Sequence, residues 1–316
     1  MRAICAMASF VAAAGLLVLP AHAEYPEGPI TFIVPYSPGG GTDIGVRTWQ
    51  PYMEQCLGGT IVVQNKPGGG AILGMAELAK SYPDGYTLGS TNTPNVYTNA
   101  ISGEVPWQLD SFVFLGALVG GRSTIVVRED SPLQSVADLV QMAKDKGGAV
   151  NVGMSALGGD DHFMLIQVAK ATGLNFTYIP MNDSPTVRNA LMGGHIDITA
   201  MSHAEAATLK GSIRPISVAS EERVELWPEV ATLKEQGYDV VSGSNHVISA
   251  PKGIPEEVEQ KWSSCLQEVG KNPDFIADAK KRSVPLVVMS ADETRNYITK
   301  DDTFLRALWA EDPWIK

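Results

Sequence analysis

Three glycine-rich segments contain the residues of this sequence that are best suited to chemistry, at 38–43 (PGGGTD), 67–71 (PGGGA) and 153–162 (GMSALGGDDH). Each follows a run typical of a strand and precedes a run typical of a helix. Backbone N–H groups at such a junction point outward at the positive end of the helix dipole, where they can bind a phosphate or a carboxylate. The first segment has no GxxxxGKS/T pattern, and GGGTDIG matches the dinucleotide pattern GxGxxG poorly. The alternatives are an anion held by backbone N–H groups and a plain turn in which Asp43 only caps the helix.

The elements that must position these loops alternate along the chain between short β-rich runs and helical runs, the pattern of an α/β protein. We expect strands at 30–35, 60–64, 86–90, 112–119, 123–128, 150–154, 175–179, 196–200, 213–219 and 246–250. We expect helices at 42–55, 72–80, 136–146, 162–172, 185–192, 204–209, 229–236, 256–271, 274–281 and 291–309. Ligands bind outside the carboxyl ends of parallel strands. The first two loops should therefore lie together at one sheet edge, and the third should face them from a second domain.

The overall composition supports two compact domains. The chain has 316 residues and is 44% hydrophobic, enough for sizeable cores. Crossing points near residues 122 and 237 predict a discontinuous first domain, 24–122 and 237–316, and a second domain, 123–236. A formal net charge of -11 argues against a nucleic-acid partner. It does not exclude an anionic ligand, since local N–H groups can outweigh distant surface charge.

The first 23 residues have the pattern of a Sec-type signal peptide that is cleaved on export. Arg2 is followed by an apolar stretch at 10–19 and by the small-x-small sequence Ala21-His22-Ala23. We therefore expect a periplasmic protein. Two cysteines, Cys56 and Cys265, remain after cleavage, and in an oxidising compartment they form either a disulfide or two buried thiols. The sequence leaves that choice open, because it does not give the distance between them.

Two rival readings involve catalysis or metal. Ser155 is followed by acids and by His162, but GMSALG misses the GxSxG nucleophile pattern by one residue, so a serine hydrolase is disfavoured. His195-x-Asp197 and His203-x-Glu205 have ligand-like spacing without an HExxH motif or a cysteine set. We therefore expect no catalytic residues, no metal and no cofactor.

Six segments, in this order, carry a resemblance to one family: VPYSPGGGTD, NKPGGGAILGMAELAKSYPDGYTLG, GMSALGGDDH, YIPMNDSPTVRNALMGGHID, SVASEERVELWPEVATLKEQGY and SAPKGIP. Together they resemble the substrate-binding receptors of tripartite tricarboxylate transporters, the Bug or TctC-like family. The resemblance implies a monomeric two-lobed periplasmic binding protein of type II that closes on its ligand like a Venus flytrap. It implies a small carboxylate as ligand and the permease subunits of such a transporter as partner, with no enzymatic activity. An alternative is a periplasmic sensor that feeds a two-component system.

The resemblance also implies a set of site residues. One carboxylate would be held by the first two loops, through Tyr36, Ser37, Gly40, Gly41, Thr42, Asp43, Gly69, Gly70 and Ala71. The opposite lobe would contribute Ser155, His162, Asn182, Asp183, Asp197 and Ser202.

The third loop departs from the family pattern, because GMSALGGDDH stands where GSSGxGSSxH is common, and Asp183 adds another acid. Extra acids near the cleft would repel a second ligand carboxylate. This argues against a tricarboxylate such as citrate and favours a zwitterion or a monocarboxylate with a polar tail. The alternative is that Asp160 and Asp161 merely occupy a helix N-terminal turn, where acids are favoured anyway.

Overall fold

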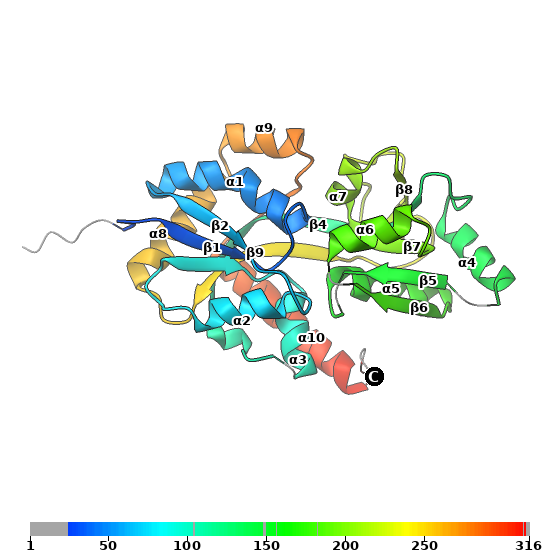
Figure 1. The fold of residues 1–316 in the computed structure, drawn as a ribbon, viewed down its shortest axis with the longest axis horizontal. Helices are drawn as coiled ribbons and strands as arrows, with labels where there is room; N and C mark the ends of the chain where they lie inside the picture. The colour runs from blue at the N-terminus through cyan, green and yellow to red at the C-terminus, as the bar shows by residue number, and fades with distance from the viewer. Residues whose placement is uncertain are drawn as a thin grey trace, which may run out of the picture.

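A computed structural model describes residues 25–103, 105–147, 150–155, 157–181, 183–311 and 313, so the expected signal peptide lies outside the described residues. The chain forms two α/β lobes that lie side by side along the longest axis of the molecule (Figure 1). Within the described ranges, no helix is both long enough and apolar enough to cross a membrane.

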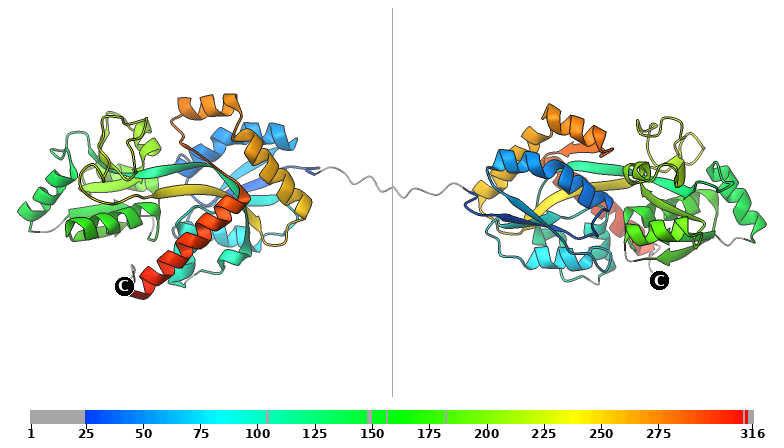
Figure 2. Two further views of the ribbon diagram at one scale, coloured as in Figure 1. Left: turned by 180° about the vertical axis from the view of Figure 1, so that it is seen from behind. Right: turned by 45° about the horizontal axis from the view of Figure 1, so that its top comes forward.

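The first lobe is built on a mixed sheet in which three parallel strands come from the N-terminal part of the chain. Its strand order is β2-β1-β3-β9-β4-β10. The strands are β1 (Ile30–Val34), β2 (Ile61–Asn65), β3 (Thr87–Ser90), β4 (Phe112–Arg128), β9 (Gly243–Pro251) and β10 (Leu286–Met289). The helices are α1 (Gly41–Leu57), α2 (Ile72–Lys80), α3 (Asn95–Ser102), η1 (Leu109–Ser111), α8 (Glu256–Val269), α9 (Pro273–Lys281) and α10 (Ala291–Glu311). Seen from behind, α10 runs diagonally along the first lobe, where it packs against α3 and β4 (Figure 2).

The second lobe is built on a smaller sheet with the order β6-β5-β7-β4-β8. Its own strands are β5 (Val150–Met154), β6 (Phe176–Pro180), β7 (Ile198–Ser202) and β8 (Ile213–Val218). Its helices are α4 (Val136–Asp145), α5 (Asp160–Thr172), α6 (Ser184–Met192) and α7 (His203–Thr208). α4 begins at an N-cap, because the side chain of Ser135 accepts a hydrogen bond from Asp138 N–H (3.2 Å).

Two neighbouring strands connect the lobes. β4 pairs with β9 over its first part and with β7 and β8 over its last part, and the chain returns to the first lobe along β9 (Figure 1). At the crossing, Gly121 pairs with Ser244 and Arg122 with Gly243. The expected domain boundaries near residues 122 and 237 stay predictions, because strand pairing continues from one lobe into the other and does not by itself define a folding unit.

The structure differs from the predicted secondary structure at four places. The strands expected at 112–119 and 123–128 are one strand, β4, and neither α3 nor β10 was expected. The helix expected at 229–236 is a series of turns. There the backbone pairs with β8 instead, since Val218 N–H donates to Ala231 O (3.3 Å) and Leu233 N–H donates to Val218 O (2.9 Å). Backbone groups engaged in this way cannot form the i to i−4 bonds of a helix.

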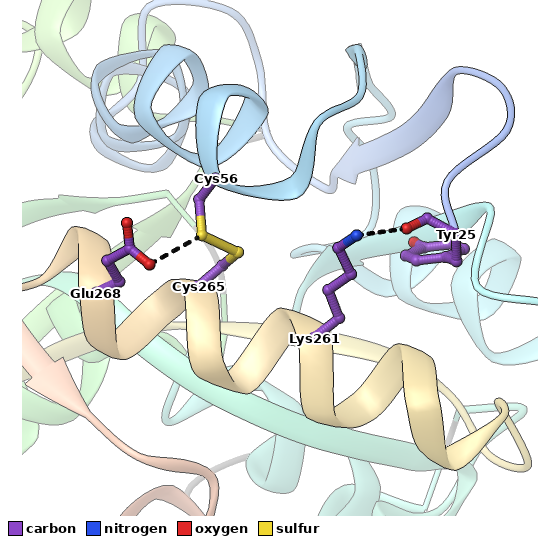
Figure 3. The surroundings of a disulfide bond; sticks show 5 residues. All are labelled: Tyr25, Cys56, Lys261, Cys265 and Glu268. Atoms are coloured by element: carbon purple, nitrogen blue, oxygen red, sulfur yellow. Dashed lines mark hydrogen bonds between the residues drawn. A yellow bond between two sulfur atoms is a disulfide. The ribbon is translucent and has the colours of Figure 1, made fainter.

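The core of the first lobe is aromatic and is closed by a disulfide. Phe32 of β1 packs edge-on against Trp49 of α1 and lies parallel to Trp262 of α8, with ring centroids 5.0 and 6.5 Å apart. On the outside of this core a Cys56–Cys265 disulfide joins α1 to α8, and the Glu268 carboxylate lies 3.6 Å from the Cys56 sulfur (Figure 3). The two cysteines therefore form a disulfide, which is one of the two states that the sequence left open.

Candidate ligand-binding site

A cavity of about 90 Å³ lies between the two lobes. One wall comes from the loops that follow β1, β2 and β3 of the first lobe. The other comes mainly from the N-terminal ends of α5, α6 and α7 of the second lobe. The sequence predicted a ligand at the ends of β1, β2 and β5, and the cavity contains residues of all three glycine-rich loops that follow these strands.

The first-lobe wall presents two helix N-termini that have no side-chain cap. The N-cap residues of α1 and α2 are Gly40 and Ala71, and neither side chain bonds a backbone N–H of its helix. In the second loop, Gly68, Gly69 and Gly70 all have positive φ (138°, 59° and 65°), which explains the glycine run. In α2, Ile72 N–H and Leu73 N–H bond Gly69 O and Gly68 O (3.3 Å each), which leaves the N–H groups of Gly70 and Ala71, just before the helix, to face the cavity. Uncapped N–H groups at such a junction are donors for an anion.

Asp43 shapes the first loop from behind the cavity instead of lining it. Its buried carboxylate accepts hydrogen bonds from Gly39 N–H (2.9 Å), Arg47 Nε (2.9 Å) and Asn65 Nδ2 (3.0 Å). Burial alone would raise the pKa of Asp43, but the bonds from Arg47, Gly39 and Asn65 outweigh it and lower the pKa. Asp43 therefore fixes the loop that carries the N–H donors.

Two asparagines that the sequence analysis missed complete the first-lobe wall. Asn92 and Asn95 line the cavity, and each is 3% exposed. Asn92 Nδ2 donates to Thr42 Oγ1 (2.7 Å), whereas Asn92 Oδ1 and Asn95 Nδ2 have no hydrogen-bond partner among the described residues. The available signal was the polar stretch STNTPN directly after the strand predicted at 86–90, which ends at the same sheet edge as the first two strands.

The second-lobe wall is acidic. Asp160 is the first residue of α5, and its carboxylate accepts a hydrogen bond from Ser123 Oγ (3.1 Å). Glu205, in the first turn of α7, is 4% exposed and pairs with Arg188 (2.9 Å). Asp160 is half-buried, and the part of its side chain that protein atoms leave exposed faces the cavity. Burial and the neighbouring Asp161 raise the pKa of Asp160 to about 7. Burial also raises the pKa of Glu205 to about 7, although Arg188 opposes it.

The lobes touch directly around the cavity. Ser37 Oγ donates to Asp183 Oδ2 (2.6 Å), and Thr98 Oγ1 donates to Gly158 O (2.6 Å). Arg188 also reaches the first lobe, at Gly39 O (3.4 Å). The structure is therefore a closed arrangement in which hydrogen bonds cross the cleft.

The predicted site residues divide into those that the structure brings to the cavity and those that it does not. Ten line it: Tyr36, Ser37, Gly40, Gly41, Thr42, Gly70, Ala71, Ser155, Asp183 and Ser202. Gly69 lies between two lining glycines, Asp43 supports the loop, and Asn182 lies outside the described residues.

Two predicted second-lobe residues lie away from the cavity. His162 is 2% exposed, accepts a hydrogen bond from Gly158 N–H at Nδ1 (3.0 Å), and contacts the Tyr178 ring edge-on. Burial lowers the pKa of His162 to about 4. Asp197 pairs with Lys146 (2.6 Å) and accepts from Asn151 N–H (2.9 Å) just before β7, at the opposite end of that strand from Ser202.

The arrangement offers no support for the two rival chemistries. Ser155 Oγ donates to Asp161 Oδ2 (2.7 Å), while His162 Nδ1 is engaged with a backbone N–H, so serine and histidine do not form a nucleophile–base pair. In the described ranges no three His, Cys, Asp or Glu side chains gather closely enough to hold a metal ion.

Two α/β lobes joined by paired strands, with a polar cavity between them, define a solute-binding protein, and comparison with solved structures agrees. The periplasmic binding protein BugD has a TM-score of 0.83 and 25% identity over 91% of this chain and 98% of its own. A protein of R. palustris solved with adipate has a TM-score of 0.84 and 21% identity over 90% and 97% of the two chains. The predicted two-lobed fold is confirmed.

The chain belongs to the tripartite tricarboxylate transporter family receptors, whose family model, TctC, matches residues 46–308. The "UPF0065 protein in gbd 5' region" of Cupriavidus necator is 30% identical over 274 residues, which cover 85% of this chain and 84% of that protein. The predicted family is therefore confirmed.

Proposed function

We propose that the protein is a periplasmic receptor that captures a small carboxylate in the interlobe cavity and delivers it to a tripartite tricarboxylate-type membrane transporter. The observation that carries this proposal is the pair of uncapped helix N-termini, α1 and α2, that meet at one wall of the cavity. Their N–H groups can bind a carboxylate without a buried cationic side chain. The binding of adipate by a protein of the same fold supports a carboxylate ligand.

The proposed mechanism is capture by closure. In the open state the first-lobe loops take the carboxylate through the N–H groups around Gly41, Thr42, Gly70 and Ala71. The second lobe then closes over it, and the bond from Ser37 to Asp183 forms. A ligand that contacts both walls binds the closed form more tightly and shifts the population toward it. The membrane permease would recognise the closed form, and no bond in the ligand is made or broken.

The periplasmic location of the proposal rests on the expected signal peptide and on the relatives. BugD is a periplasmic binding protein. A disulfide such as Cys56–Cys265 persists in an oxidising compartment and is rare in the cytosol, which is consistent with export.

The proposal is tested by substituting Gly41. A Cβ at residue 41 would have Glu205 Oε2, 4.0 Å away, as its nearest neighbour, so a larger side chain there projects toward the opposite wall. Because Gly41 does not have a positive φ, Gly41→Leu places a side chain in the cavity without backbone strain. Gly28→Leu is the matched control, since a Cβ at Gly28 meets nothing within 4 Å and that glycine also lacks a positive φ.

The measurement is a thermal-shift screen of the mature protein against mono-, di- and tricarboxylates, amino acids, aromatic acids, sugars and divalent cations. A carboxylate-bearing compound should raise the melting temperature by mass action, Gly41→Leu should abolish that rise, and Gly28→Leu should preserve it. Stabilisation by sugars or metals alone would refute the proposal, and so would an undiminished response in Gly41→Leu.

A further inference from the structure

We infer that the ligand carries an ammonium group in addition to its carboxylate, and that Asp160 and Glu205 of the second lobe bind that group. The inference rests on the proposed function, because it takes the carboxylate to be held by the first lobe. It specifies the ligand class as a small zwitterion, such as an amino acid.

The two walls of the cavity have opposite electrostatic character. The first-lobe wall presents the positive ends of α1 and α2 without a side-chain cap. The lining residues of the second-lobe wall include four acids, namely Asp160, Asp161, Asp183 and Glu205. The cation described beside them is Arg188, which is already bonded to Glu205 and to Gly39 O. A ligand that matches both walls is negative at one end and positive at the other.

The four acids differ in how well the protein satisfies them. Asp161 accepts from Ser155 N–H, Ser155 Oγ and His162 N–H (2.6–2.8 Å). Asp183 accepts from Ser37 Oγ and caps α6 through Thr186 N–H. These two carboxylates are committed to the protein's own structure and are not available to a ligand.

Asp160 and Glu205 are less completely satisfied. Asp160 accepts a hydrogen bond from the neutral Ser123 hydroxyl, and no cationic side chain of the described residues forms an ion pair with it. Glu205 bonds Arg188 through Oε1, while its Oε2 faces Gly41 across the cavity. Burial and the charge of Asp161 raise the pKa of Asp160 to about 7, a cost that a bound cation would relieve.

Two unpartnered amide atoms independently indicate a polar ligand with both donors and acceptors. Because Asn92 Nδ2 is engaged by Thr42 Oγ1, the unpartnered atom of Asn92 is its oxygen, an acceptor that suits an ammonium group. The unpartnered atom of Asn95 is its Nδ2, a donor that suits a carboxylate. Both side chains are nine-tenths or more buried and line the cavity.

A ligand with a second carboxylate in place of the ammonium group fits this wall poorly. Its distal carboxylate would lie against Asp160 and Glu205, and like charges buried together repel strongly. The same groups attract an ammonium ion, which donates up to three hydrogen bonds and can reach more than one acceptor. The acidic wall therefore discriminates between compounds of similar length by the charge of the distal group.

The test is calorimetric titration at pH 8 with pairs of compounds that differ by the amine: L-alanine and propionate, L-aspartate and succinate, L-glutamate and glutarate, 4-aminobutyrate and butyrate. The proteins are the wild type, Asp160→Asn, Glu205→Gln and Asp239→Asn. Asp239 is an exposed acid, paired with Lys234 (3.3 Å), whose replacement makes the same change in net charge outside the cavity.

We expect the amine-bearing member of at least one pair to bind the wild type at least tenfold more tightly than its partner. Asp160→Asn and Glu205→Gln should each weaken that member roughly tenfold or more, the range for losing a hydrogen bond to a charged group. They should affect the amine-free member less, and Asp239→Asn should change neither. The pairwise comparison on the wild type, together with Glu205→Gln, decides the question independently of Asp160→Asn.

Three results would overturn the inference. One is equal or tighter binding of the amine-free member in every pair that binds. Another is that no pair binds and that the compounds which do bind are carboxylates without an amine. In either of these two results the proposed function survives. The third is failure of every carboxylate-bearing compound to bind, which would remove the proposed function as well.

Discussion

Removing the Cys56–Cys265 disulfide should destabilise the protein strongly while leaving the folded cavity unchanged. The bond closes a loop with a sequence separation of 209 residues, which contains the whole second lobe. The chain-entropy relation gives about 5 kcal/mol for a loop of that length at 25 °C. This is an upper bound, since a denatured state with residual structure loses less entropy on cross-linking. We therefore expect the free energy of unfolding to fall by about 2–5 kcal/mol.

The assay is urea unfolding followed by tryptophan fluorescence, because Trp49 and Trp262 are buried on the two helices that the bond connects. The oxidised wild type is compared with the wild type in reductant and with the double variant Cys56→Ala/Cys265→Ala. Reduction removes the bond without deleting atoms, so it separates the cross-link from the small cavity that alanine leaves at Cys265. Neither cysteine lines the ligand cavity, so ligand affinity of the folded protein should not change.

A loss below about 1 kcal/mol, in protein whose bond is verified by mass spectrometry, would refute the loop-closure reasoning. A reduced wild type that remains as stable as the oxidised protein, beside a destabilised double variant, would assign the effect to packing instead of the cross-link.

Two further predictions concern the cavity walls. The Asp160→Asn variant and the wild type should be equally stable below the ordinary carboxyl pKa of 3.8, and the variant should become progressively more stable as the pH rises from there toward 7. The reason is that a raised carboxyl pKa, about 7 in the fold against 3.8, favours the folded state only while the group is protonated. The gain is at most about 4 kcal/mol, from three units at 1.36 kcal/mol each. Urea midpoints across this pH range measure it, and a difference independent of pH would contradict it. Ser37→Ala should weaken ligand binding by roughly three- to tenfold, because it removes a partly exposed bond to Asp183 that only the closed form makes. Ser102→Ala, whose hydroxyl bonds within the first lobe, should not, and equal affinities for the two variants would show that the contact does not stabilise closure.

Backbone-determined features were predictable from the sequence. Runs of glycine indicate positions where the chain needs positive φ or a close approach, so the sequence alone placed the loops at 38–43 and 67–71 at the binding site. α3 was missed because NVYTNAIS contains aromatic and β-branched residues and follows Pro94, none of which signals a helix. Asn92 and Asn95, which lie just before and at the start of this helix, were therefore not predicted as site residues. β10 is a four-residue strand at the sheet edge that pairs with β4 alone, and it too was not predicted.

Side-chain direction in the second lobe was harder to predict, because it depends on the phase of each element. Asp160 and His162 are two positions apart on α5, about 200° around the helix, so when Asp160 faces the cavity His162 faces the lobe interior. Asp197 and Ser202 lie at opposite ends of the same strand, and only the carboxyl end faces the cleft. The positions of the acids in the sequence place them near the cleft, but they do not show which side chains face the cavity.

The paired crossing of β4 and β9 bears on what the membrane transporter of the proposed function would detect. At that crossing a Cβ on Gly243 would lie only 2.1 Å from Gly121 O, so the two backbones are in contact with no side chain between them. A hydrogen-bonded ribbon of this kind can flex across its width, but it resists shear, since sliding would break its ladder. Bending about this ribbon is therefore easier than sliding of one lobe past the other. Under the proposed function, a permease that contacts both lobes would sense occupancy through the angle between them, whatever the chemistry of the ligand.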